Sequence, residues 1–226
     1  MAACETSNAG GANGLASAHS APYVILSFDI GVKNLGTCAF SVTQGQPAAT
    51  MLFWKVLSLA QEKERTPTVN ELALRLFSTL DEVVAELESK DIKIDTVLLE
   101  NQPSRLNGAM KSLQMMIYSY FQLRRHWEGF VSSVFMISAS QKLLGHTHII
   151  ADPPKPKTGY QLNKWRAVQF AEVYIKDCEE LVTLFRSHKK KDDLSDAFLQ
   201  GVSWARKHGY TIESAKADAK AEARTN

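Results

Sequence analysis

A short apolar run that ends on a single acid constrains this chain more than any other feature. Residues 24–31 read VILSFDIG, a branched apolar stretch that meets Asp29 and then Gly31. A run of this length before a turn residue predicts a buried strand, with Asp29 at its carboxyl end. Burying an unpaired ionised carboxylate is very unfavourable, so Asp29 requires a partner. A cation is the usual partner, and two further acidic places in the chain are candidates to share it.

Composition predicts one globular domain and leaves the class of partner open. The chain has 226 residues, of which 45% are hydrophobic, enough for a sizeable core. Its formal net charge is only +2, so attraction to nucleic acid must come from local patches. No apolar run approaches the roughly 20 residues that a membrane span needs, so no membrane partner is expected.

The cysteines indicate an intracellular, reducing compartment. Cys4, Cys38 and Cys178 are far apart and lack a C-x-x-C pair. Neither a disulfide framework nor a zinc cluster is therefore expected.

The two ends of the chain differ in composition from its middle. Residues 1–21 are mostly Ala, Gly, Ser and Asn without any Lys or Arg, which fits neither a secretory signal nor a transit peptide. We expect a disordered leader there, and a folded domain over residues 22–208. Residues 209–226 are rich in Ala, Lys and Glu, which predicts a flexible or helical tail.

The spacing of turn residues predicts an antiparallel meander at the start of the fold. Two short polar connections, at residues 30–36 and 43–47, each join extended apolar runs. Connections this short join antiparallel neighbours. The three expected strands are residues 24–29, 37–42 and 49–56.

The next two strands are expected to return parallel to the first. A capping box from Thr68 to Glu71 opens an amphipathic helix, and the apolar run at residues 94–99 follows it and ends on Glu100. A helix between two strands favours a parallel return, so the carboxyl ends of the first and fourth strands meet at one sheet edge. With a fifth strand at residues 131–137, the predicted fold class is α/β: a mixed five-stranded sheet, three antiparallel strands and then parallel strands, flanked by helices.

Apolar residues at helical spacing predict three more helices. The helix over residues 109–127 has more apolar surface than a solvated helix needs, and packing in the core and packing against a second copy of the chain both remain open. Another helix is expected over residues 162–175. The last one begins at the acidic cluster of residues 192–196.

That last helix carries the other acids. Asp193 and Asp196 are three residues apart, so they project from one face while Leu194 turns toward the sheet. Acids at a helix start also suit capping and the helix dipole, so the pair alone does not define a site. Asp29 and Glu100 also each end a strand of the same sheet, and the four acids together favour a functional site.

Such a cluster of acids predicts bound divalent cations. Four carboxylates at one sheet edge repel each other unless a cation is present. Oxygen ligands favour Mg²⁺ or Mn²⁺, whereas His146 and His148 lack a third ligand nearby and are not expected to bind a metal. Two ions about 3.5 to 4 Å apart suit phosphodiester cleavage, because they activate water and stabilise the departing oxygen. The sequence therefore predicts hydrolysis of a nucleic acid backbone.

Four motifs follow one another along residues 23–206. They are Asp29-x-Gly31-x-x-Asn34-x-Gly36, Glu100-x-Gln102, Lys142, and Lys190-Lys191-Asp192-Asp193-x-x-Asp196-Ala197. This order resembles the RuvC-like Holliday junction resolvases of the RNase H superfamily, above all the poxvirus and iridovirus resolvases and their fungal mitochondrial relatives. The acid motif after the lysine run is its most specific part.

The resemblance implies an RNase H-like fold and a homodimer that makes paired Mg²⁺-dependent nicks in branched DNA, the four-way junction. Carried over by position, the metal ligands are Asp29, Glu100, Asp193 and Asp196. Lys142 becomes a contact to the scissile phosphate, with an ordinary surface lysine as the alternative, and Asp192 remains an alternative to Asp193. A virus-encoded protein at a cytoplasmic replication site and a nuclear protein are both compatible with it.

Basic side chains could line a surface that follows phosphates. The candidates for nucleic acid contact are Arg105, Lys155, Lys157, Lys164, Lys189, Lys190 and Lys191.

Three other functions remain open. An RNase H-type nuclease could act on RNA:DNA hybrids or flaps with the same acids. An actin-like or sugar-kinase-like ATPase also uses an Asp-x-Gly hairpin, which Gly31 fits, but such folds need two lobes and usually a longer chain. A DNA-binding relic of the fold would have lost acids, and all four positions are filled.

Overall fold

The computed structural model describes residues 21–61, 63–65, 67–102, 108–146, 150, 153 and 159–218. All but the last residue of the predicted leader, residues 1–21, lie outside these ranges, so the leader stays a prediction. The strands are β1 (Tyr23–Asp29), β2 (Asn34–Val42), β3 (Ala48–Ser58), β4 (Ile94–Glu100), β5 (Val131–Ile137) and β6 (Ser214–Ala217). The helices are α1 (Val69–Glu88), α2 (Gly108–Trp127), α3 (Gly159–Ile175), α4 (Glu179–Ser187) and α5 (Lys191–Lys207), with a short 3₁₀ helix, η1 (Ala139–Gln141), after β5. In this part of the chain, no helix is both long and apolar enough to cross a bilayer.

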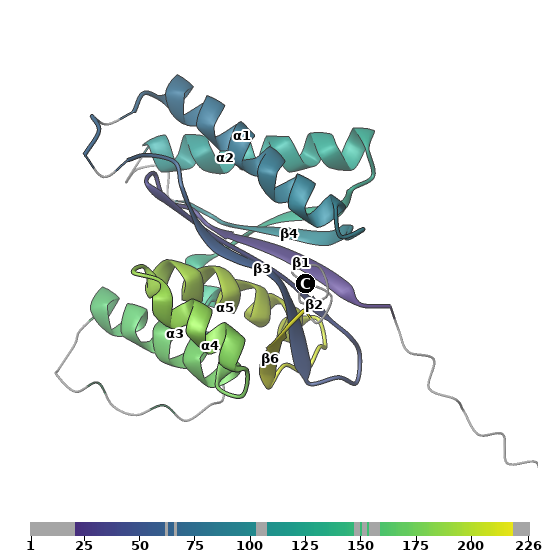
Figure 1. Ribbon diagram of the computed structural model, residues 1–226. Coiled ribbons are helices and arrows are strands. Elements are labelled where there is room, and N and C mark those ends of the chain that lie inside the picture. Colours follow the sequence, from purple (N-terminus) through teal and green to yellow (C-terminus); the bar gives the residue numbers. More distant parts are fainter. Residues whose placement is uncertain are drawn as a thin grey trace, which may run out of the picture.

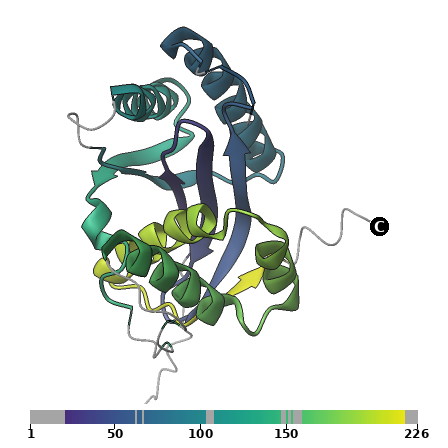
Figure 2. The ribbon, with the colours of Figure 1, turned by 90° about the vertical axis from the view of Figure 1, so that its left-hand side faces the viewer.

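The strands form one mixed sheet in the order β5-β4-β1-β2-β3-β6. β1, β2 and β3 are antiparallel neighbours, whereas β4 runs parallel to both β1 and β5. α1 and α2 lie on one face of the sheet, and α3, α4 and α5 lie on the other (Figure 1, Figure 2). The predicted α/β class and the parallel return of the fourth strand are confirmed.

A sixth strand corrects the predicted five-stranded sheet. β6 runs parallel to β3 and pairs Ala48 with Ser214 and Met51 with Ala217. The expectation of a flexible or helical tail is therefore wrong for residues 214–217. Ala and Lys favour a helix in isolation, but pairing with the edge of β3 outweighs that preference.

Two differences concern shorter features. α4 was not predicted, because its nine residues bury only Leu181 and Phe185 and so show too little of a helical repeat. β2 begins at Asn34, three residues earlier than expected, because Gly36 already pairs with Asp29 across the meander.

α1 forms as its sequence predicts. The Thr68 side chain accepts a hydrogen bond from the Glu71 backbone N–H, and the Glu71 carboxylate accepts one from the Thr68 N–H, which is the predicted capping box. Its buried face consists of Leu72, Leu76, Leu80, Val83, Val84 and Leu87.

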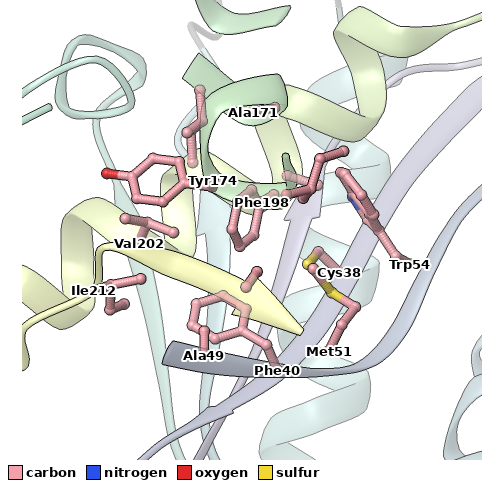
Figure 3. Packing of buried hydrophobic residues seen from close by; sticks show 14 of the residues in the cluster. Cys38, Phe40, Ala49, Met51, Trp54, Ala171, Tyr174, Phe198, Val202 and Ile212 are labelled. Carbon is pink, nitrogen blue, oxygen red and sulfur yellow. The ribbon is translucent and has the colours of Figure 1, made fainter. Parts of the chain in front are cut away.

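The core on the other face of the sheet leaves no space between α5 and β2. The Phe198 ring packs against Phe40 and Trp54, with ring centroids 5.6 Å apart in both pairs (Figure 3). A Cβ built on Gly201 of α5 would lie 2.5 Å from the Phe40 ring, so only glycine fits there. α5 therefore lies directly on the middle strands.

Alternation along the strands decides which face carries the acids. Ile25 of β1 and Leu98 of β4 belong to the core that contains α5. Because side chains on a strand alternate with a period of two, Asp29 and Glu100 emerge on that same face.

Candidate active site

Three carboxylates converge on one ammonium at the carboxyl edge of the sheet. Lys142 Nζ lies 2.6 Å from Asp29 Oδ1, 2.7 Å from Glu100 Oε2 and 3.3 Å from Asp196 Oδ2. Lys142 is only 6% exposed, so these ion pairs are largely shielded from solvent. The four residues come from β1, β4, α5 and the turn after η1, so the fold assembles them from distant parts of the sequence.

Two contacts fix the start of α5 over the meander. The Trp54 indole N–H on β3 donates to the Leu194 carbonyl at 3.0 Å. Gly36 on β2 lies opposite Asp29, and a Cβ built on Gly36 would lie 2.4 Å from the Asp193 carbonyl oxygen. Only glycine lets the α5 backbone approach β2 this closely, which places the first turn of α5 beside the end of β1.

A side chain from the turn after η1 and one from α5 hold the backbone of Lys142. His146 Nε2 lies 2.8 Å from the Lys142 carbonyl oxygen, and Ser203 Oγ donates to the same oxygen at 3.1 Å. Because a carbonyl only accepts, His146 Nε2 carries the proton and Nδ1 accepts from the Tyr174 hydroxyl at 2.9 Å. His146 thus orders the Lys142 turn, while His148 lies outside the described residues.

A buried glutamine of α5 supports the strand ends below the acids. Gln200 Nε2 donates to Ser27 Oγ at 3.0 Å and to the Phe28 carbonyl at 3.2 Å. Phe28 directly precedes Asp29, so Gln200 ties α5 to the end of β1. Sequence reasoning missed Gln200 and the His146 network, because no spacing pattern marks a single polar residue that bonds to a distant backbone.

The charges in the cluster are unbalanced. Burial and the neighbouring Asp29 carboxylate together raise the pKa of Glu100 to about 7, although Lys142 acts against them. Burial and Asp29 likewise raise the pKa of Asp196 to about 6 against the attraction of Lys142. Burial alone would lower the pKa of Lys142, but the three carboxylates outweigh it and raise that pKa above its ordinary range. One ammonium cannot neutralise them all, so the cluster attracts protons or further positive charge.

The structure separates the two adjacent aspartates of α5. Asp193 lines the same cleft as Asp29 and Asp196. Burial, then the charges of Asp192 and Asp29, raise the pKa of Asp193. Asp192 instead pairs with Lys164 of α3, which lowers the pKa of Asp192 although burial alone would raise it. Asp193 is thus placed for a site role, and Asp192 joins α3 to α5.

The cleft has a volume of about 880 Å³, and its lining combines the acids with basic and aromatic side chains. Besides the acids and Lys142, these include Lys33, Tyr160, Lys164, Arg166 and Lys190. Two of the predicted nucleic acid contacts, Lys164 and Lys190, therefore face the acids' cleft. Lys189 and Lys191 adjoin Lys190 in sequence, whereas Arg105, Lys155 and Lys157 lie outside the described residues.

The oxygen atoms of the cluster suit a divalent ion, but an ammonium lies between them. Within the described ranges, no three His, Cys, Asp or Glu side chains are arranged to hold one metal ion as they stand. The donor chemistry nevertheless fits Mg²⁺ or Mn²⁺, since these ions prefer carboxylate oxygens and the carboxylates already share one cation.

Comparison with protein families decides the relationship. Residues 23–208 match the model of the family described as Poxvirus A22 protein, a range that runs from β1 past the end of α5. The chain belongs to this family. It is also 28% identical over 150 residues to the uncharacterized protein L451 of Acanthamoeba polyphaga mimivirus. The aligned region covers 61% of this chain and 34% of that protein. The chain thus spans about a third of the length of this curated relative.

Solved structures share the fold of this A22-family chain. The fowlpox virus Holliday junction resolvase has a TM-score of 0.54 at 14% identity, covering 81% of this chain and 99% of that one. The fowlpox virus resolvase in complex with Holliday junction DNA has a TM-score of 0.52 at 15% identity, covering 82% and 99%. The yeast mitochondrial Holliday junction resolvase Ydc2 has a TM-score of 0.51 at 21% identity, covering 80% and 78%. The predicted resemblance to poxvirus and fungal mitochondrial resolvases, and the RNase H-like fold, are confirmed.

In this A22-family protein, most of the predicted site residues meet in one place. Asp29, Glu100, Asp196 and Lys142 are in direct contact, and Asp193 lines the cleft beside them. Lys142 is buried, so the alternative of an ordinary surface lysine is wrong.

Proposed function

We propose that this protein is a structure-selective endodeoxyribonuclease that resolves four-way DNA junctions by paired phosphodiester hydrolysis. The observation that carries the proposal is the convergence of Asp29, Glu100 and Asp196 on one buried positive charge, in a cleft that basic residues also line. Membership of the poxvirus A22 family and the fold shared with the fowlpox virus and yeast resolvases support it.

The proposed cofactor is Mg²⁺ or Mn²⁺, bound as two ions. Asp29, Glu100, Asp193 and Asp196 are the residues that would hold it. When bound, such ions make water a better nucleophile and stabilise the departing oxygen.

The chain's own basic residues would bind and orient the DNA backbone. Lys164 and Lys190 line the cleft, and they would contact phosphates that flank the scissile one. Such contacts would fix the register of the strand without reading its sequence. Lys142, once freed from the carboxylates, would stabilise negative charge that develops on the phosphate being cleaved.

Paired nicks require two active sites, so we expect a homodimer. Met115, Leu123 and Trp127 of α2 are 42%, 58% and 75% exposed, and large apolar side chains gathered on one helix favour a protein contact. Trp127→Glu should convert the dimer to a monomer in light scattering. The matched exchange Leu184→Glu on α4 should leave the dimer intact. A wild-type monomer would contradict this assignment.

We also expect the enzyme to act inside the cell, in a reducing compartment. Cys38 and Cys178 are both free thiols, which a reducing compartment would preserve.

The test is a cleavage assay on a synthetic four-way junction. The wild-type protein should make paired nicks with Mg²⁺ and none with EDTA, and it should leave linear duplex intact. Asp29→Asn should bind the junction without cutting it, because the DNA-contacting surface is unchanged. Preferential cleavage of an RNA:DNA hybrid or flap, or turnover of ATP in place of DNA, would contradict the proposal in favour of those activities.

A further inference from the structure

The position of Lys142 raises a question that the proposed metal chemistry leaves open. Its Nζ atom lies within 2.6 to 3.3 Å of carboxylate oxygens from three different elements of the fold. These oxygens are also the ones that would coordinate a divalent ion. The ammonium and the ion therefore compete for one place.

The two cations cannot share that place. Mg²⁺ holds carboxylate oxygens at about 2.0 to 2.1 Å, so an ion bound by Asp29 and Glu100 would lie very close to the present position of Nζ. Like charges this close repel strongly in a partly buried site. Metal binding thus requires the ammonium to move.

The surroundings allow the side chain to move while its backbone stays fixed. His146 and Ser203 hold the Lys142 carbonyl at 2.8 and 3.1 Å, and the Lys142 N–H donates to the Ala139 carbonyl at 3.3 Å. The side chain, in contrast, borders the open cleft. It can swing toward the cleft without unfolding the turn.

We propose that Lys142 is a positioning residue that holds Asp29, Glu100 and Asp196 together before metal binds, and that a divalent cation displaces its ammonium into the cleft. This inference rests on the proposed function, because it concerns the same site. It explains why a lysine is buried among acids that would otherwise repel each other. The displacement would also bring the ammonium into the cleft, where a DNA phosphate would bind, only when the divalent cation is present.

Amine labelling of the full-length protein, read out by mass spectrometry, tests the displacement directly. Lys142 should label slowly in EDTA and at least about tenfold faster with saturating Mg²⁺, since exchange shifts it from a buried to an open state. Lys55, which pairs with Glu86 of α1 and does not line the cleft, is the internal control and should not change. Unchanged Lys142 labelling while calorimetry shows Mg²⁺ bound would overturn the exchange, and so would the absence of any Mg²⁺ binding.

Lys142→Met provides the second measurement. Removal of the competing charge should tighten Mg²⁺ binding by about tenfold or more, whereas equal or weaker binding would contradict the competition. Because the labelling uses wild-type protein, the inference remains testable even if this variant folds poorly. A wild-type protein that nicks junctions while Lys142 stays protected would retain the proposed function and lose only the exchange.

A different observation concerns an exposed aromatic ring beside the acids. Tyr160, in the first turn of α3, is 72% exposed and borders the same cleft as Asp29 and Glu100. Its ring lies 5.0 Å from Lys164 Nζ, and Lys164 is itself tied to Asp192. The ring is therefore supported on one side and open to solvent elsewhere.

An exposed tyrosine with basic neighbours suits a nucleobase better than a protein partner. Every base offers a flat face that stacks on an aromatic ring, and nearby cations contact the adjoining phosphates. Bases at a DNA branch point are less completely stacked than those within a duplex. We infer that Tyr160 stacks on an unstacked base of the proposed DNA substrate and so favours branched over linear DNA.

A junction with 2-aminopurine at the branch point tests this stacking. Wild-type protein and Tyr160→Phe should quench the fluorescence on binding, whereas Tyr160→Ala should not and should bind the junction roughly 5- to 100-fold more weakly. Leu184→Ala on α4 is the control and should match wild type. Equal quenching and affinity in Tyr160→Ala would refute the stacking. A wild type that nicks junctions normally in that case would leave the proposed function standing.

Discussion

The two faces of the sheet use the same strands for different purposes. Toward α1 and α2, β1 and β4 present Leu26, Phe28 and Leu99, which are buried in an apolar core. Toward α5, one residue further along, they present Asp29 and Glu100. At the carboxyl ends of β1 and β4, the period of two along a strand therefore separates side chains in an apolar core from the acids that carry the proposed chemistry.

The difference between the faces also appears in their buried polar groups. On the α5 side, Ser27 and Gln200 are fully buried and bond to each other beneath the acids. Such groups stabilise only when they are paired, so each restricts where the neighbouring backbone can lie. Both faces have an apolar core, but at the carboxyl edge of the sheet the α5 face gives up apolar packing for the precise placement of strand ends.

Substitutions of two adjacent residues on β4 test the difference between the faces most directly. Glu100→Gln should slow junction cleavage by roughly 1,000-fold or more, because it removes a carboxylate on which transition-state stabilisation depends. Leu99→Ala should instead lower the free energy of unfolding by about 2 to 5 kcal/mol through the cavity that it leaves. Urea unfolding and single-turnover cleavage measure the two effects.

The two variants should show opposite patterns. Leu99→Ala should cleave at a nearly normal rate per folded molecule, and Glu100→Gln should still bind the junction. A loss of cleavage in folded Leu99→Ala equal to that in Glu100→Gln would mean that the two faces are not separable.

Within the α5 face, Asp192 and Asp193 sharpen the comparison. Asp193→Asn should reduce cleavage by roughly 100-fold, because Asp193 borders the cleft of the other acids, whereas Asp192→Asn should cost less than about tenfold. Asp192 pairs with Lys164, so its loss loosens α3 and leaves the acids in place. Parallel cleavage assays of the two variants decide between them, and the reverse order would assign the site role to Asp192.

The close approach of α5 to β2 predicts a smaller effect on stability. Gly36→Ala should lower the free energy of unfolding by about 1 to 3 kcal/mol, because its Cβ would overlap the Asp193 carbonyl oxygen. It should also reduce cleavage by moving the first turn of α5. Gly108→Ala, where a Cβ meets no atom of the described residues within 4 Å, is the control and should be neutral or stabilising by up to about 1 kcal/mol. Equal unfolding midpoints for wild type and Gly36→Ala would contradict the tight contact.

Sequence reasoning reached the acids because each stands at a position that a pattern defines. Asp29 and Glu100 end apolar runs, and Asp193 and Asp196 share a helical face, so local periodicity and the parallel return together predict their meeting. Lys142 came from the family resemblance alone, since a lysine after a strand has no special pattern. Its burial among three acids follows from tertiary packing.

What the sequence could not predict depends on partners distant in the chain. β6 forms because Ser214–Ala217 meets the edge of β3, more than 150 residues away, and its local composition favours a helix. Gln200 is one polar residue in a helix that is buried on nearly all sides, and only the fold shows that it reaches the end of β1.

The acids of the α5 face also predict that stability depends on pH, whereas the buried apolar residues toward α1 and α2 carry no such dependence. The pKa of Glu100 is about 7 in the folded protein and 4.5 as its ordinary value, so between these values the folded state binds more protons than the unfolded state. The free energy of unfolding of the metal-free protein should therefore fall as pH rises from about 4.5 to about 7, by about 2 kcal/mol. Asp196, with a pKa of about 6, adds to the slope.

Urea unfolding in EDTA at pH 5, 6, 7 and 8 measures this dependence of stability on pH. Glu100→Gln should flatten the slope, whereas Glu86→Gln on α1 should not, because Lys55 lowers the pKa of Glu86 against the effect of burial. Stability that rises with pH over this range, or a slope that persists in Glu100→Gln, would show that Glu100 carries its charge without strain in the metal-free site.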